Sequence, residues 1–273
     1  MAGGTTFDAE TALRPGREAG VFEGDVAETW WIERGPNGGY IAVLLLRAMM
    51  ETVAESARHP RSLTVHYLEP AAAGPCRVAV AVERAGRGVT TLSARLTQGD
   101  RTCALALAAF AAPRASLTLS EAVPPAAPPP EESPPFAPVE VGFPRFTAHY
   151  DYRWAVGDPP FSGSRSSRVG GWMRLAEPRP ADALLVAAFS DAWMPCIFPR
   201  LAGPVGAPTI DLTIHFRADL PVPNAAPDDW YLCAFSSRLG TAGFFEEDGE
   251  IWSRDGVLLA QSRQLAMLPT LRE

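Results

Sequence analysis

One acidic residue lies inside one of the most apolar stretches of this 273-residue chain. The segment LLVAAFSDAWMPCIF puts Asp191 one turn after Ala187 and Ala188 and one turn before Met194 and Pro195. An ionised carboxylate in such surroundings is costly unless hydrogen bonds compensate it, and carboxylates held in this way often act in catalysis. The alternative is a helix-surface Asp or a local cap, because Pro195 cannot donate to the Asp191 carbonyl and weakens the helix there.

Two polar residues at strand positions are candidate partners of this carboxylate. Thr209 opens the segment TIDLTIHF, and Gln264 lies in DGVLLAQSRQLAML near the end of the chain. A carboxylate can take a proton from water, and a hydroxyl and an amide can hold that water in line for attack. Either residue alone is more typical of a solvated strand position, so the prediction depends on all three lying together.

A third candidate feature is the segment ERGPNGGYIAVLLLRAMM, where glycine and proline interrupt the chain before an apolar helix that begins near Tyr40. A helix start has free backbone N–H groups and the positive end of the helix dipole. Gly38 and Gly39 could offer these groups to an oxyanion. They could equally serve to let the helix start pack tightly against a sheet, and we favour this second interpretation.

The remaining reactive residues argue against other kinds of site. The segment FSGSRSSR lacks the flanking glycines of a GxSxG motif, and RAGRG is not a GxGxxG loop. The histidines are scattered and the cysteines form no CxxC pair, so we expect neither a metal site nor a disulfide framework. These residues are His59, His66, His149, His215, Cys76, Cys103, Cys196 and Cys233.

The elements that must position the candidate residues form two similar halves, separated by a proline-rich segment at 121–144. Proline fixes φ and removes a donor, so an extended connector is expected there. LTVHYLEP at 63–70 matches LTIHFRAD at 212–219. In each half a helical stretch, at about 39–57 and 181–198, precedes alternating strands. The strands are expected at about 61–68, 76–84, 89–97 and 102–111, and at 207–217, 230–237, 243–253 and 257–268.

This order of elements predicts the fold class. Helices and strands are segregated, which indicates an α+β protein with antiparallel sheets. The helices are apolar almost all round and should be buried. A sheet wrapped around a buried central helix is a hotdog, and two in tandem make a double hotdog. We expect an N-terminal hotdog repeat at 1–112, a proline-rich linker at 113–145 and a C-terminal hotdog repeat at 146–273, which carries the candidate catalytic residues.

The motifs occur in an order that resembles a known family. An Asp in a buried helix, then TID at the start of a strand, then DGVLLAQSRQ on the last strand is similar to type II (TesB-like) acyl-CoA thioesterases, which are double-hotdog proteins. GPNGGYIAVLLLRAM also resembles the helix start of the wider thioesterase-like superfamily. The TesB branch has a His directly after TID, where this chain has Leu212.

The resemblance implies both a reaction and a set of residues. By it, Asp191, Thr209 and Gln264 hold the family's catalytic positions, with Asp191 as general base on a water that Thr209 and Gln264 orient. The substrate would be a thioester of coenzyme A or of an acyl carrier protein. Coenzyme A would enter as part of the substrate, and no other cofactor or metal is implied.

Two other functions remain open at this stage. A non-catalytic acyl-CoA binding or accessory protein of lipid or polyketide metabolism would need the same tunnel without the catalytic arrangement. Hotdog hydratases and dehydratases usually pair an Asp with a His near a helix start, and neither predicted helix start here has that pair. The first half also has no acid between Tyr40 and Arg47 and has alanine where the second has Gln264, so we expect one site rather than two.

Composition limits the partners. The chain is 47% hydrophobic and 20% charged, and its net charge of −7 argues against an extended nucleic-acid surface. No apolar run approaches the roughly 20 residues of a membrane span, and MAGGTTFDAETALRPG has no signal-peptide core. We therefore expect a cytoplasmic protein that binds neither membrane nor nucleic acid. Since one chain holds both repeats, a homo-oligomer is allowed but not required.

Overall fold

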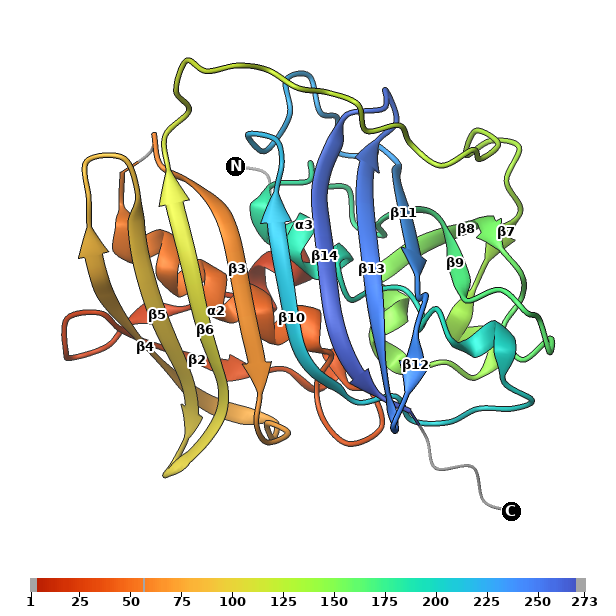
Figure 1. The fold of residues 1–273 in the computed structure, drawn as a ribbon. Helices are drawn as coiled ribbons and strands as arrows, with labels where there is room; N and C mark the ends of the chain where they lie inside the picture. The colour runs from red at the N-terminus through yellow and green to blue at the C-terminus, as the bar shows by residue number, and fades with distance from the viewer. Residues whose placement is uncertain (1–3, 56, 269–273) are drawn as a thin grey trace.

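The two copies of the repeated LT motif lie side by side at the centre of one large sheet (Figure 1). Strands β3 (His59–Tyr67) and β10 (Thr209–Phe216) pair antiparallel, so that Thr64 lies opposite Thr213. Their hydroxyl oxygens are 3.0 Å apart. Because these threonines are equivalent positions of the repeat, the two halves are related by an approximate two-fold axis that passes between them.

The computed structural model describes residues 4–55 and 57–268. The first half contains α1 (Thr6–Glu10), β1 (Arg14–Pro15), β2 (Val21–Val26), η1 (Glu28–Trp30), α2 (Gly38–Val53), β3, β4 (Gly74–Ala85), β5 (Thr90–Gln98) and β6 (Arg101–Ala111). The second contains β7 (Pro135–Phe136), η2 (Pro138–Val141), η3 (Arg145–His149), β8 (Tyr150–Gly157), β9 (Arg168–Leu175), α3 (Ala183–Phe189), η4 (Phe198–Arg200), β10, β11 (Tyr231–Ser236), β12 (Gly240–Thr241), β13 (Phe244–Ser253) and β14 (Leu258–Met267).

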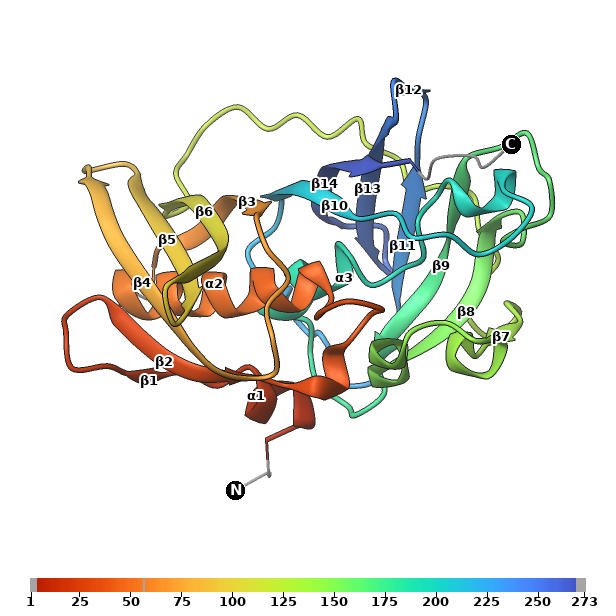
Figure 2. The same cartoon turned by 90° about the horizontal axis from the view of Figure 1, so that it is seen from below.

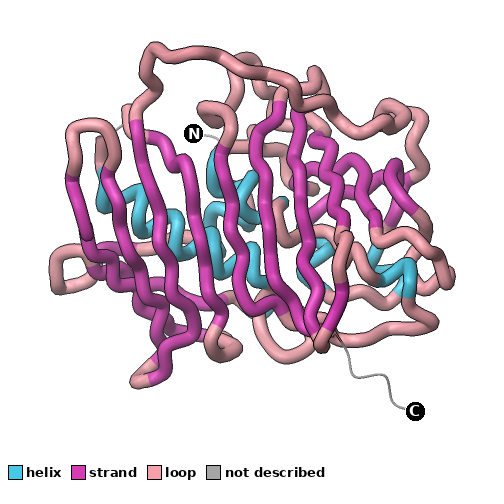
Figure 3. Tube along the Cα trace, in the orientation of Figure 1, coloured by secondary structure: helices cyan, strands magenta, loops and turns pink. Residues whose placement is uncertain are grey.

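The strands of both halves form one continuous antiparallel sheet in the described residues. Its order is β1-β2-β4-β5-β6-β3-β10-β14-β13-β11-β9-β8-β7, with β12 paired to β13. Figure 2 shows the sheet curving around the two helices, and Figure 3 shows how much of the chain is strand. This is the double hotdog predicted from the sequence. The eight predicted strands are all present, with ends within two residues of those expected, and β2, β8 and β9 are additional strands that precede the helices.

Helix α2 is the buried axis of the first repeat. Most of its residues from Gly39 to Met49 are buried. The Asn37 side chain caps its start by accepting from the Tyr40 N–H, and Ala54, at φ 51°, ends it in the left-handed conformation. The helix therefore ends at Val53, a few residues before the predicted boundary near residue 57.

Helix α3 is much shorter than the sequence suggests. A helix was expected over about 181–198, but α3 ends at Phe189, and Asp191 lies in the turn that follows. Pro195 has no N–H to continue the helical hydrogen bonds. The residues after the turn remain buried although they are not helical, and this burial explains why they read as a continuation of the helix.

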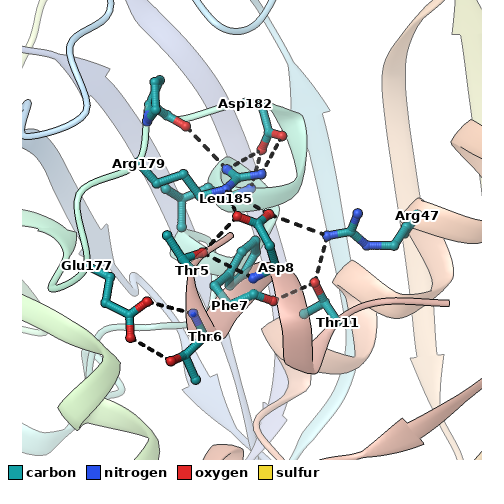
Figure 4. A network of polar contacts seen from close by, with 11 residues as sticks. Thr5, Thr6, Phe7, Asp8, Thr11, Arg47, Glu177, Arg179, Asp182 and Leu185 are labelled. Carbon is teal, nitrogen blue, oxygen red and sulfur yellow. Dashed lines mark hydrogen bonds and ion pairs between the residues drawn. The ribbon is translucent and has the colours of Figure 1, made fainter. Parts of the chain in front are cut away.

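The N-terminal helix α1 connects the starts of the two halves through a polar network (Figure 4). Arg179 donates to Asp8 at 3.0 Å and to Asp182 at 2.7 and 2.9 Å. Asp182 is also the N-cap of α3 and accepts from the Leu185 N–H. Arg47 of α2 donates to Thr11 at 2.7 Å. One small helix thus links α2 to the start of α3.

The proline-rich segment crosses between the repeats as an extended, mainly exposed chain, visible along the upper edge of Figure 1. It contains only the short edge strand β7 and the 3₁₀ turn η2 within the described residues. No helix in the described part of the chain is long and apolar enough to cross a membrane.

Candidate active site

The Asp191 carboxylate lies against the start of α2, which belongs to the other repeat. Its Oδ2 accepts hydrogen bonds from the Gly39 N–H at 2.9 Å and from Asn37 Nδ2 at 3.0 Å. Asn37 Nδ2 also lies 2.7 Å from the Asp191 carbonyl oxygen. Since Asn37 is also the cap of α2, one side chain fixes the helix start and the carboxylate together.

The surroundings of Asp191 shift the pKa of its carboxyl to near neutral pH. Burial is the largest influence and raises the pKa from 3.8 to about 7. The Gly39 amide lowers this pKa, the negative charge of Glu247 raises it, and the Gly38 amide and Asn37 lower it. A general base works best when its pKa lies near the pH of the reaction. The residue as a whole is of intermediate burial.

Glycine is required at the start of α2 because other groups approach it closely. A Cβ at Gly39 would lie 2.8 Å from the Ala188 carbonyl oxygen and 3.2 Å from Asp191 Cβ, so the close neighbour of Gly39 is α3 with its following turn rather than the sheet. A Cβ at Gly38 would lie 2.9 Å from Asp191 Oδ2. The Gly39 N–H is already donated to the carboxylate.

Tyr67 at the end of β3 closes the other side of this helix start. Its hydroxyl donates to the Gly38 carbonyl at 2.9 Å, which fixes the first turn of α2. Burial raises the pKa of Tyr67 well above its usual value, and the charges of Asp191 and Asp211 raise it further. Tyr67 is therefore a neutral donor throughout the physiological range.

Thr209 and Gln264, two of the three residues that the sequence analysis expected to lie together, are hydrogen-bonded to each other. Thr209 Oγ1 donates to Gln264 Oε1 at 3.0 Å. Gln264 Nε2 in turn donates to Glu247 Oε1 at 2.5 Å. The Cys196 N–H donates to Glu247 Oε2 at 2.5 Å. Thr209 is partly exposed, whereas Gln264 and Glu247 are buried beneath it.

Strand register explains why these side chains meet. Leu212 lies opposite Gln264, and Gln264 lies opposite Glu247, so one cross-strand row runs over β10, β14 and β13. An irregularity in the register between Thr209 and Asp211 displaces the start of β10 from regular pairing. The row points toward the core, so its polar residues must satisfy one another.

The first repeat has an apolar row at the equivalent place. Leu63, the counterpart of Leu212, lies opposite Ala108, and Ala108 lies opposite Leu92. Both Ala108 and Leu92 are buried. The fold therefore does not require polar residues here, and the second repeat alone carries them.

Asp191 and the Thr209–Gln264 pair are not directly hydrogen-bonded to each other in the described residues. The connection between them passes through Glu247, whose charge acts on Asp191 and whose carboxylate holds Gln264.

Sequence reasoning missed three residues of the site, namely Asn37, Tyr67 and Glu247. Asn37 precedes the glycines and is a typical N-cap residue, so its type and position could have identified it. Glu247 lies two residues from each of the buried residues Phe245 and Gly249 along β13. Residues two apart on a strand share a face, so this period of two would have placed Glu247 inward. Tyr67 had no distinguishing signal, because its role depends on how β3 ends beside α2.

Comparison with known proteins identifies the family. The profile described as the acyl-CoA thioesterase C-terminal domain matches residues 121–268, and that of the N-terminal domain matches residues 26–111. The chain belongs to the acyl-CoA thioesterase family. An uncharacterised protein of Mycobacterium tuberculosis is 28% identical over 298 residues, which cover 96% of this chain and 98% of the relative.

Solved structures agree with this assignment. A hot dog fold protein of unknown function from Alicyclobacillus acidocaldarius is 28% identical with a TM-score of 0.89, over 98% of this chain and 100% of that one. The acyl-CoA thioesterase II TesB2 of Mycobacterium marinum has a TM-score of 0.77 over 97% and 99% of the two chains, and at 21% identity this likeness shows the fold alone. The expected resemblance to TesB-like thioesterases is confirmed.

Proposed function

We propose that this member of the acyl-CoA thioesterase family hydrolyses an acyl thioester to a carboxylic acid and a free thiol, with a water that Asp191 activates. The observation that carries the proposal is the Asp191 carboxylate, held by Gly39 and Asn37 and with its pKa raised by burial to about 7. At neutral pH a substantial fraction of such a carboxylate is ionised and able to take a proton.

The hydrogen-bond polarity of the neighbouring pair supports a water position. Thr209 uses its own proton to donate to Gln264 Oε1, so its remaining lone pairs are acceptors. A water that donates one proton to Thr209 and the other to Asp191 directs a lone pair at the thioester carbonyl. In this scheme Gln264 orients the Thr209 hydroxyl rather than touching the water, which refines the role expected from the sequence.

The reaction then balances without any further reagent. The water oxygen bonds to the carbonyl carbon while Asp191 takes its proton. The tetrahedral intermediate collapses with cleavage of the C–S bond, and the departing thiolate recovers the proton. From the sequence, the Gly38 and Gly39 amides are both candidate oxyanion donors at the α2 N-terminus, but the Gly39 N–H donates to Asp191 and the Gly38 amide also acts on this carboxylate. The oxyanion role is therefore proposed for the Gly38 amide only in the substrate complex, where it would turn from Asp191 to the thioester oxygen. A positioned oxyanion donor contributes about 3 kcal/mol. Coenzyme A enters only as part of the substrate.

The test is thiol release from a panel of acyl-CoA thioesters of different chain length. We expect wild-type protein to hydrolyse at least one of them and Asp191→Asn to lose about 10²–10⁴ in kcat, the range for removal of a positioned base. Asp100→Asn, a change of the same kind at an exposed turn, is the matched control and should keep full activity.

Other outcomes would decide against the proposal. Equal rates for wild type and Asp191→Asn would exclude Asp191 as the base. Tight binding of acyl-CoA with no release of thiol from any substrate would favour the non-catalytic binder instead.

A further inference from the structure

Glu247 is a buried carboxylate to which the scheme above gives no chemical step. It is 4% exposed, and each of its oxygens has one donor, Gln264 Nε2 on Oε1 and the Cys196 N–H on Oε2. Cys196 lies five residues after Asp191, in the same connection between α3 and η4. Glu247 thus joins the inward face of β13 to the last strand and to the segment that holds the base.

The position of Glu247 determines which way the Gln264 amide faces. An amide has one donating and one accepting end, and an ionised carboxylate can only accept. Glu247 therefore holds the Nε2 end of Gln264 and leaves Oε1 to face Thr209. Thr209 must then donate to Gln264, which leaves only acceptor lone pairs for a water.

We propose that Glu247 is a positioning residue of the Asp191 site, whose carboxylate fixes the direction of the Gln264–Thr209 hydrogen bonds and so makes Thr209 an acceptor for the attacking water. This inference rests on the proposed hydrolysis and adds a residue to it. The four groups form one directed series, from water to Thr209 to Gln264 to Glu247, in which every group donates to the next.

The same carboxylate has an electrostatic effect on the base. Its negative charge raises the pKa of Asp191, after the larger effects of burial and the Gly39 amide. Tyr67 and Tyr150 also face Asp191, and Cys196 faces Glu247. Burial raises the pKa of each of these three groups far from neutrality, so they stay uncharged. Burial is the largest influence on Glu247 and raises its pKa, the hydrogen bonds from Cys196 and Gln264 lower it, and the charge of Asp248, the next residue on its strand, raises it.

The first repeat argues that Glu247 is not there to build the sheet. Its counterparts of Glu247 and Gln264 are Leu92 and Ala108, which pair at the equivalent register and are buried. Replacement of a buried polar pair by apolar residues is often neutral or stabilising. If Glu247 and Gln264 served only in packing, replacing both by apolar residues would therefore leave the activity unchanged.

The first experiment compares pH profiles of kcat/KM for wild type, Glu247→Gln and Glu247→Asp. We expect Glu247→Gln to lose roughly 10- to 100-fold in kcat with little change in KM, because Thr209 is no longer held as an acceptor. The acid limb of the kcat/KM profile of Glu247→Gln should move to lower pH, because the negative charge of Glu247, which disfavours the ionised form of Asp191, is gone. Glu247→Asp keeps the charge, so its acid limb should stay close to that of wild type.

The second experiment does not depend on activity. The side-chain carboxyl of Asp191 is titrated by ¹³C NMR, and the signal is assigned by its absence in Asp191→Asn. The midpoint should fall in Glu247→Gln and also in the double variant Glu247→Leu with Gln264→Ala, which carries the residues of the first repeat and should fold well. The double variant should fold with a small loss of stability, because the buried Cys196 N–H loses its acceptor, and should be poorly active.

These readouts separate the two proposals. If wild type hydrolyses no acyl-CoA, the proposed function fails, while the Asp191 midpoint still tests the effect of Glu247. Two outcomes would overturn the inference. One is that neither the Asp191 titration midpoint nor the acid limb of the kcat/KM profile moves from its wild-type pH in Glu247→Gln and in the double variant. The other is that either variant keeps the full wild-type kcat.

Discussion

The backbone N–H of Gly39 donates to Asp191 Oδ2 at 2.9 Å, across 152 residues of sequence. This hydrogen bond joins the helix start of one repeat to the acid of the other. Neither repeat contains a complete site, because the carboxylate comes from the second and the amides that hold it come from the first. In the proposed mechanism, the two halves of the duplicated fold therefore contribute different parts of one site.

Gly39→Ala should damage both stability and activity. The new Cβ would lie 2.8 Å from the Ala188 carbonyl oxygen and 3.2 Å from Asp191 Cβ, so α2 and the Asp191 turn must move apart. Overpacking of this kind costs about 1–3 kcal/mol. Thermal unfolding and thiol release measure the two effects. Gly88→Ala is the matched control, since a Cβ at Gly88 meets nothing within 4 Å. Equal melting temperatures for the two variants would contradict the close approach.

Asp191→Asn should make the protein more stable at alkaline pH. Burial raises the pKa of Asp191 from 3.8 to about 7, so the folded state binds this proton more tightly than the unfolded state. The resulting stability is fully present below about pH 4 and is lost as the pH rises through about 7. Asparagine cannot ionise, so the variant should gain about 1–3 kcal/mol at about pH 8, an amount reduced by partial exposure.

Chemical denaturation at several pH values measures this gain. The difference between Asp191→Asn and wild type should shrink toward acid pH, where both side chains are uncharged. A constant difference at every pH would show that Asp191 does not titrate in the neutral range.

The activity of wild type should follow the ionisation of the same group. If Asp191 is the base, kcat/KM should rise with pH and reach half its plateau near the pKa of about 7. The measurement is an initial-rate profile at constant ionic strength, with unfolding monitored at each pH. A profile that is flat between about pH 5 and 8 would remove Asp191 from the base role.

Much of the fold could be predicted from the sequence because strands and turns are local signals. The eight expected strands alternate or are bounded by turns such as Asp255-Gly256, and each is present in the sheet. Strand β9 could not be predicted in the same way, because Gly170 and Gly171 interrupt its alternation. The closest neighbours of a Cβ at these glycines would be backbone atoms of adjacent strands, at 2.2 and 2.0 Å.

The site was predictable only in part, since its key relationships are tertiary. Motif order located Asp191, Thr209 and Gln264, but the early end of α3 and the contact of Asp191 with α2 depend on how the two repeats pack. Glu247 lies among the acidic residues of FFEEDGE, which look like a solvated charge run. The period of two along β13 separates Glu247 from its acidic neighbours, and the register places it opposite Gln264.

Arg179→Ala should destabilise the protein through the network of Figure 4. Arg179 is largely buried and pairs with both Asp8 and Asp182, so its removal leaves two carboxylates without their main partner. We expect a loss of about 1–3 kcal/mol. Arg254→Ala is the control, because Arg254 pairs with Glu131 at an exposed position and such pairs contribute under about 1 kcal/mol. Similar losses for both variants would show that α1 does not anchor α3.

Two neighbouring tyrosines on β8 should respond oppositely to loss of the hydroxyl. Tyr152 donates to the Ala192 carbonyl at 2.9 Å, beside Asp191. The buried Tyr150 hydroxyl has no hydrogen-bond partner within the described residues. Tyr152→Phe should therefore cost about 1 kcal/mol and loosen the Asp191 turn, whereas Tyr150→Phe should leave stability unchanged or raise it. Denaturant unfolding of both variants decides this. A marked loss of stability in Tyr150→Phe would instead show that its hydroxyl is hydrogen-bonded to a buried water.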